Sequence, residues 1–163
     1  MKKILFSLFA VAALCAGFAS CDDDDDDINR GTHKASPAAN FEGVYTGYWS
    51  VFDASNVLEQ ENIPGSITVT KNDSVATIVT LILAADGISA VNGKSGVGNI
   101  AWVNNDAKIS NANASNGFGS VFSADITDAV LSFKFSLSVR SGRSTVTKFY
   151  QFKSTEEPSE LAQ

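Results

Sequence analysis

Apolar and polar residues alternate strictly over the segment from 131 to 139. Leucines, phenylalanines and a valine occupy every second position, and serines and one lysine lie between them. A period of two predicts a β-strand with one face buried and the other in solvent. Residues 140–143 supply a glycine-containing turn, and 144–153 predict the returning strand. The pattern therefore predicts a β-hairpin close to the C-terminus.

Between 41 and 130 the chain has shorter runs rich in valine, isoleucine and aromatic residues. Such runs, separated by Gly, Asn and Asp turn residues, predict β-strands. They lie at 44–52, 67–70, 75–83, 97–103, 107–110 and 121–126. Residues 53–64 predict a longer connection with room for one helical turn. About eight strands without a long helix predict an all-β fold, a small antiparallel β-barrel, with a β-sandwich as the alternative.

The N-terminus has a different pattern. Two lysines precede an apolar segment, 4–17, which is shorter than the roughly 20 apolar residues that span a bilayer. Ser20-Cys21 follows, and after it come the six aspartates Asp22, Asp23, Asp24, Asp25, Asp26 and Asp27. This arrangement resembles a bacterial lipoprotein signal, and the aspartate run resembles the acidic export signal of Bacteroidetes surface lipoproteins. The resemblance implies cleavage before Cys21 and acylation of that cysteine, palmitate included. Cys15 is the weaker candidate because the large Leu14 precedes it.

This signal predicts how the chain is organised. Residues 1–20 are expected to be the signal peptide, 21–40 an acidic disordered tether, 41–153 the barrel domain and 154–163 a disordered tail. We therefore expect a protein that is held on the outer membrane by its N-terminal lipid and exposed at the cell surface. Both cysteines would be removed or alkylated, so the fold is expected to rest on its core without a disulfide.

The residue inventory of the barrel segment argues against several functions. Residues 41–153 contain nine acidic and eight basic side chains, a balance of −1 that gives no electrostatic footprint for nucleic acid. The one histidine, His33, lies in the tether, so neither a histidine-based triad nor a zinc site is expected. Glu59 and Glu61 share a predicted loop with Asp53. Solvated loop charges are a simpler interpretation of these carboxylates than a catalytic pair for glycoside cleavage. The sequence predicts no enzyme, no metal and no cofactor.

A second resemblance concerns the first predicted strand. Gly47-Tyr48-Trp49 resembles the Gly-x-Trp motif of lipocalin-like (calycin) barrels. The resemblance implies that Trp49 plugs the closed end of an eight-stranded barrel and that 53–64 forms the lid. The Thr-Asp-Tyr motif and the last-strand arginine of lipocalins are missing, so an ordinary core tryptophan is the alternative.

Lys148 is the most informative polar residue of the last hairpin. If Val139 pairs with Ser144, the alternation keeps the apolar faces together and places Lys148 opposite Phe135, inside the barrel. An inward lysine needs a partner, such as a carboxylate, an aromatic ring or the head group of a ligand. A β-bulge that turns Lys148 outward and brings Phe149 inward is the alternative. The inward arrangement predicts a ligand site made of Trp49, Phe133, Phe135, Lys148 and Tyr150.

Two functions follow from these expectations. The first is an interaction or accessory module of a surface complex, with a surface protein or glycan as partner. The second is the binding of a small apolar or amphipathic ligand in a lipocalin-like cavity. A barrel filled by its own aromatic side chains favours the first, and an open apolar cavity of several hundred Å³ favours the second. Separately, Asp73-Ser74-Val75 resembles the acceptor pattern for O-glycosylation in exported Bacteroidetes proteins, which marks Ser74 as a possible modification site.

Overall fold

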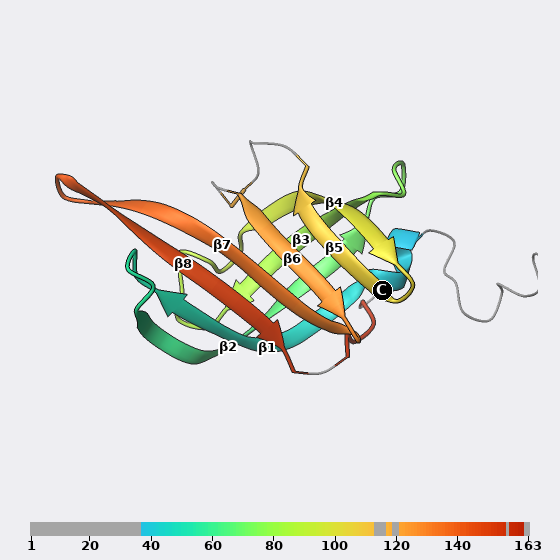
Figure 1. Cartoon of the computed structure of the whole chain (residues 1–163), viewed down its shortest axis with the longest axis horizontal. Helices are drawn as coiled ribbons and strands as arrows, with labels where there is room; N and C mark the ends of the chain where they lie inside the picture. Colours follow the sequence, from blue (N-terminus) through green and yellow to red (C-terminus); the bar gives the residue numbers. More distant parts are fainter. Residues whose placement is uncertain (1–36, 113–116, 119–120, 156, 162–163) are drawn as a thin grey trace, which may run out of the picture. The chain divides into compact units, whose positions relative to one another are not determined.

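Eight antiparallel strands close into a ring in which each strand pairs with its neighbours in the sequence and β1 pairs with β8 (Figure 1). The computed structural model describes residues 37–112, 117–118, 121–155 and 157–161. A 3-10 helix, η1 (Pro37–Phe41), precedes β1 (Gly43–Phe52), β2 (Leu58–Lys71), β3 (Ile78–Ala85), β4 (Ser95–Val103), β5 (Asp106–Asn111), β6 (Phe122–Thr127), β7 (Val130–Ser141) and β8 (Ser144–Ser154). The expected all-β barrel is confirmed, and the sandwich alternative is wrong.

The alternation along the strands decides which side chains form the core. In β7, Leu131, Phe133 and Phe135 are buried, while Ser132 and Lys134 are exposed. The same period of two holds along β1, where the residues at odd positions from Gly43 to Val51 are buried. Each fully buried large apolar side chain contributes about 1.5–3 kcal/mol to folding. The core therefore lies inside the ring, and the outer wall carries the polar residues of the strands together with some exposed apolar ones, Ile82 and Phe149 among them.

The predicted connection over 53–64 is mostly strand, and the expected lid is wrong. The turn contains only 53–57, where Asp53 Oδ1 accepts hydrogen bonds from the backbone N–H groups of Ser55 and Val57, both at 2.8 Å. Asn56 takes a left-handed conformation with a φ of 61°. Because this turn is so tight, β2 can begin at Leu58 and pair with the end of β1, with register shifts on either side of Val51.

The register of the last hairpin also differs from the prediction. Val139 pairs with Val146 rather than with Ser144, and Ser141 pairs with Ser144. The turn is thus only two residues long, with Gly142 at a φ of 63° in its first position, where type II′ turns require glycine. Because the faces of a strand alternate with a period of two, a shift of two residues does not exchange the inner and outer faces of the pair. The shift moves Lys148 from Phe135 to a position opposite Leu137.

Both ends of the barrel extend beyond the predicted bounds of 41 and 153. At the start, Ala38 and Phe41 of η1 belong to the core. At the end, Ser154 is 2% exposed, and its Oγ accepts a hydrogen bond of 2.9 Å from the Leu131 N–H. Ser159 forms an antiparallel bridge with Val44. The expectation of a disordered tail from 154 onward is therefore wrong for these residues, which cover the start of β1 beyond the reach of β8. Among the described residues no helix is long and apolar enough to cross a membrane.

Candidate functional site

Trp49 lies in the barrel interior, as the sequence predicts. Its side chain is fully buried, and its Nε1–H donates a hydrogen bond of 2.8 Å to the Ala84 carbonyl. A Cβ added at Gly65 on the paired strand would lie 2.6 Å from the indole ring, so only glycine leaves room for it there. A Cβ at Gly47 would clash with the Lys153 backbone. The glycine and the tryptophan of the Gly-x-Trp motif therefore each have a packing reason in this barrel.

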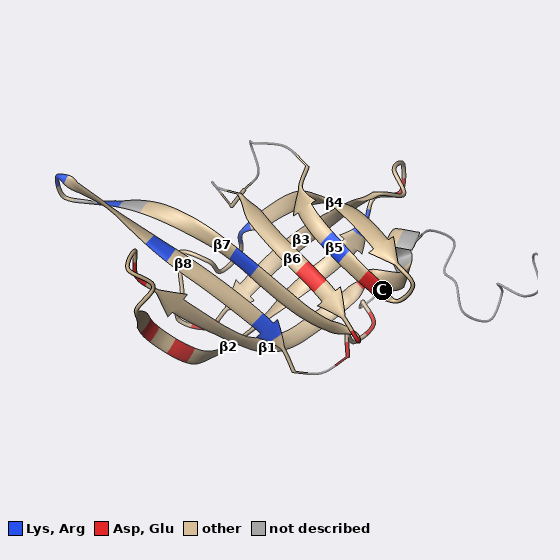
Figure 2. Cartoon of the chain, in the orientation of Figure 1, with Lys and Arg blue, Asp and Glu red and all other residues tan. Residues whose placement is uncertain are grey.

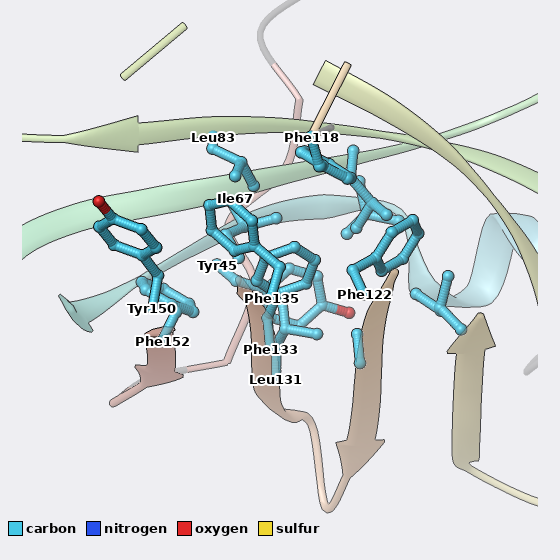
Figure 3. Close-up of a cluster of buried hydrophobic side chains, with 14 of the residues drawn as sticks. Tyr45, Ile67, Leu83, Phe118, Phe122, Leu131, Phe133, Phe135, Tyr150 and Phe152 are labelled. Carbon is cyan, nitrogen blue, oxygen red and sulfur yellow. The ribbon is translucent and has the colours of Figure 1, made fainter. Parts of the chain in front are cut away.

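Aromatic rings pack around Trp49 in this part of the interior. Figure 3 shows Phe118, Phe122, Phe133 and Phe135 gathered inside the barrel. The ring centroids of Phe133 and Phe152 lie 6.1 and 5.1 Å from that of Trp49. Phe118 reaches in from the connection between β5 and β6 and meets Phe122 at 4.9 Å and Phe133 at 5.5 Å. Such edge-on and tilted pairs add roughly 0.5–1.5 kcal/mol each beyond their buried area. The rings thus contact one another where a ligand of a lipocalin-like barrel would be expected.

Phe118 is a core residue that the sequence pattern did not reveal. It lies in a polar, asparagine-rich connection without any strand periodicity. The one available sign was Gly96 on β4, where an added Cβ would clash with the Phe118 ring. A glycine in a strand often marks such a close approach.

Tyr150 lies at the edge of this cluster, stacked on Phe135 with centroids 5.1 Å apart. It is 3% exposed, and burial raises the pKa of its hydroxyl above the ordinary value, with opposing smaller effects from Lys148 and Glu59. Four of the five predicted ligand residues, namely Trp49, Phe133, Phe135 and Tyr150, therefore meet inside the barrel.

Lys148 is the exception, because it lies opposite Leu137 rather than Phe135. Its partner is a carboxylate, one of the three kinds that the inward arrangement allowed. Its Nζ pairs with Glu59 Oε2 at 2.8 Å, and both side chains are partly exposed. The hydrogen bond from Lys148 to Glu59 raises the lysine pKa. It is not a buried inner cation, because β7 and β8 continue past the last residues paired with β6 and β1. Nor does a bulge turn it outward, because the ladder with β7 is continuous and Phe149 remains 38% exposed.

Three hollows open on the outer wall of the described part of the chain. A hollow of about 360 Å³ is lined by outer-face residues such as Phe149, Gln151 and Lys134, and it also touches the core residues Phe122, Phe135 and Tyr150. One of about 240 Å³ includes Tyr48, Gln151 and Lys134. A third, of about 320 Å³, lies over β4, β5 and β6 beside Trp102 and Lys108. No three metal-ligating side chains come together among the described residues.

The remaining predicted sites divide between the described residues and the rest. Ser74 lies exposed in the turn between β2 and β3, where its N–H donates to Asn72 Oδ1 at 2.9 Å. Its modification stays a prediction. Cys21, His33 and the aspartates from Asp22 to Asp27 lie outside the described residues.

The fold and this core define a small antiparallel β-barrel protein with an aromatic interior. The chain matches no protein-family model, no curated protein and no solved structure. Its function is therefore argued from its own residues.

Proposed function

We propose that this chain is a lipid-anchored protein of the outer-membrane surface whose non-enzymatic β-barrel acts as an interaction or accessory module of a surface complex. The observation that carries the choice of interaction is the aromatic packing inside the barrel. Trp49, Phe118, Phe133 and Phe152 contact one another at centroid distances of 5.1–6.1 Å where an apolar ligand would lie. The described hollows instead open on the outer wall, where a partner can reach them.

The anchor in this proposal rests on the N-terminal sequence. A small residue, Ser20, precedes Cys21 after an apolar segment of signal-peptide length. Acyl chains on one cysteine stabilise membrane attachment by about 0.8 kcal/mol for each buried CH₂, so several chains make it effectively permanent. The aspartates Asp22 to Asp27 would then extend the chain between the lipid and the barrel, because like charges repel.

Metabolic labelling tests this anchor. Cells that produce the protein are grown with a palmitate analogue, and the purified chain is examined for label. We expect label on the natural protein and on Cys15→Ala, and none on Cys21→Ala. Label that persists on Cys21→Ala would refute the proposed attachment site.

A second candidate is the binding of a small amphipathic ligand at the barrel end that carries Tyr150. One observation favours it. Tyr150 is almost fully buried, yet its hydroxyl makes no hydrogen bond to any described residue, while the Lys148–Glu59 pair acts on its pKa from nearby. A ligand head group at this barrel end could supply the missing partner. The aromatic packing inside the barrel favours the interaction function over this candidate.

A further inference from the structure

The hairpin formed by β7 and β8 has an uneven charge. Between Val130 and Ser154 it carries five of the eight basic residues of 41–153 and not a single acidic one. Lys148 is neutralised by Glu59, but Lys134, Lys153, Arg140 and Arg143 form no ion pair with any described residue. Figure 2 shows the basic bands along both strands and at the tip of the hairpin. A chain with a net charge of −6 thus presents one cationic wall.

Strand alternation places Lys134 and Lys153 together on the outer face of this wall. Lys134 pairs with Gln151, and Lys153 pairs with Ser132, so the two lysines are diagonal neighbours. Residue positions related in this way lie about 7–8 Å apart along the backbone of a sheet. On either side, the cross-strand pairs that contain these lysines continue into β6 and β1. Ser123 lies beside Lys134, and Tyr48 lies beside Lys153.

These residues line two adjoining hollows, which together are called the groove. The hollows of about 240 and 360 Å³ have Ser123, Lys134 and Gln151 in common, so they lie side by side over β6, β7 and β8. Aromatic side chains border the groove at two places. Tyr48 is 48% exposed at one, and Phe149 is 38% exposed at the other. A lysine pair, hydroxyl and amide groups and exposed rings therefore occur on one surface.

We propose that this groove binds an anionic oligosaccharide. A sugar ring has an apolar C–H face that packs on an aromatic ring, as Tyr48 offers, and hydroxyl groups that pair with Ser123 and Gln151. Acidic groups on the sugars, such as uronate carboxylates, would pair with Lys134 and Lys153. The inference rests on the proposed function and deepens it, because it names the surface and the class of partner.

Other acidic partners fit the groove less well. An extended acidic peptide usually binds by adding a strand to a sheet edge. Beneath the groove β6, β7, β8 and β1 are already paired with one another, so no edge is open there. Nucleic acid binding usually requires an excess of cations over the whole domain, whereas residues 41–153 have a charge balance of −1.

The test uses the full chain in detergent micelles and isothermal titration with hexagalacturonate. We expect saturable binding that weakens as salt is raised, because exposed charges are screened. The fully methyl-esterified hexamer, which has the same rings without the charges, should bind at least about tenfold more weakly. The double variant Lys134→Gln/Lys153→Gln should weaken binding by roughly tenfold. Lys71→Gln removes one positive charge at the C-terminal end of β2, outside the groove, and should leave the affinity unchanged.

Tyr48 supplies an independent check that does not depend on charge. Tyr48→Phe keeps the ring and should retain binding, whereas Tyr48→Ala should weaken it severalfold. Thermal unfolding of the Tyr48, Lys134 and Lys153 variants should match the natural protein, since these three side chains lie on the outer face. No binding of hexagalacturonate, equal binding to Lys134→Gln/Lys153→Gln, or tighter binding of hexaglutamate or a single-stranded oligonucleotide would overturn the inference. Palmitate labelling of Cys21 would be unaffected by any of these outcomes, so the two proposals fail separately.

Discussion

Tyr45 joins η1 to the barrel wall through one buried hydroxyl. Its O–H donates a hydrogen bond of 3.0 Å to the Phe41 carbonyl, and burial raises the pKa of Tyr45 to about 12. The folded chain therefore keeps this proton at a pH where an unfolded chain, with an ordinary pKa of 10.0, loses it. The stability that this difference provides is complete below pH 10 and is lost as pH rises through 12.

We expect the free energy of unfolding to fall by up to about 2–3 kcal/mol between pH 10 and 12, because one pKa unit corresponds to about 1.4 kcal/mol. Tyr45→Phe should lose this part of the pH dependence, and at pH 7 it should be destabilised by about 0.5–1.5 kcal/mol through the lost hydrogen bond. Urea unfolding of both proteins from pH 7 to 11.5 measures the effect. Equal slopes against pH would contradict it.

Single residues were predictable where they belong to a period. Trp49, Phe133 and Phe135 occur in alternating strands, and the structure places all three inside the barrel. Phe118 was not predictable. It lies in a connection, where no local alternation indicates whether a side chain is buried. The position of Lys148 depends on the register between β7 and β8, and the residues next to Lys148 in the sequence do not determine that register.

The last hairpin shows what determines a strand pair. Registers that differ by two residues keep the same residues inside, so the apolar pattern alone cannot choose between them. The choice falls to the turn, where Gly142 permits a loop of two residues and lengthens both strands. The sequence thus predicted the strands and their faces, while the register and the length of the connection at 53–57 depended on turn geometry.

Lys148 of β8 and Glu59 of β2 form a partly exposed ion pair, and such pairs contribute little to stability. We expect Lys148→Met to leave the free energy of unfolding nearly unchanged and the binding of a fluorescent fatty acid as weak as in the natural protein. Lys71→Met, at the other end of the barrel, is the matched control. A fatty acid that binds the natural protein but not Lys148→Met would favour the ligand candidate instead.

For the barrel as a whole, ring closure stabilises a part of the chain in which the described residues include no cysteine. β1 pairs with β8 over six residue pairs, and Ser159 covers the part of β1 that β8 does not reach, so the strands at the seam have partners. A barrel closed in this way exposes no sheet edge at the seam. In the proposed function, display at the cell surface depends on the acidic segment that precedes the barrel.

We expect that replacing Asp22 to Asp27 by asparagines hides the barrel from protease added to whole cells, because the acidic run is proposed to direct surface display. Lipid labelling should persist in that variant. Unchanged digestion of the variant would remove the export role from the aspartates.

The most direct test is mass spectrometry of the protein purified in detergent from its own membranes, under native and then denaturing conditions. The account predicts a covalent mass of residues 21–163 with acyl chains on Cys21, and no small apolar molecule that is lost on denaturation. An unlipidated chain, or one apolar molecule bound per barrel, would contradict it.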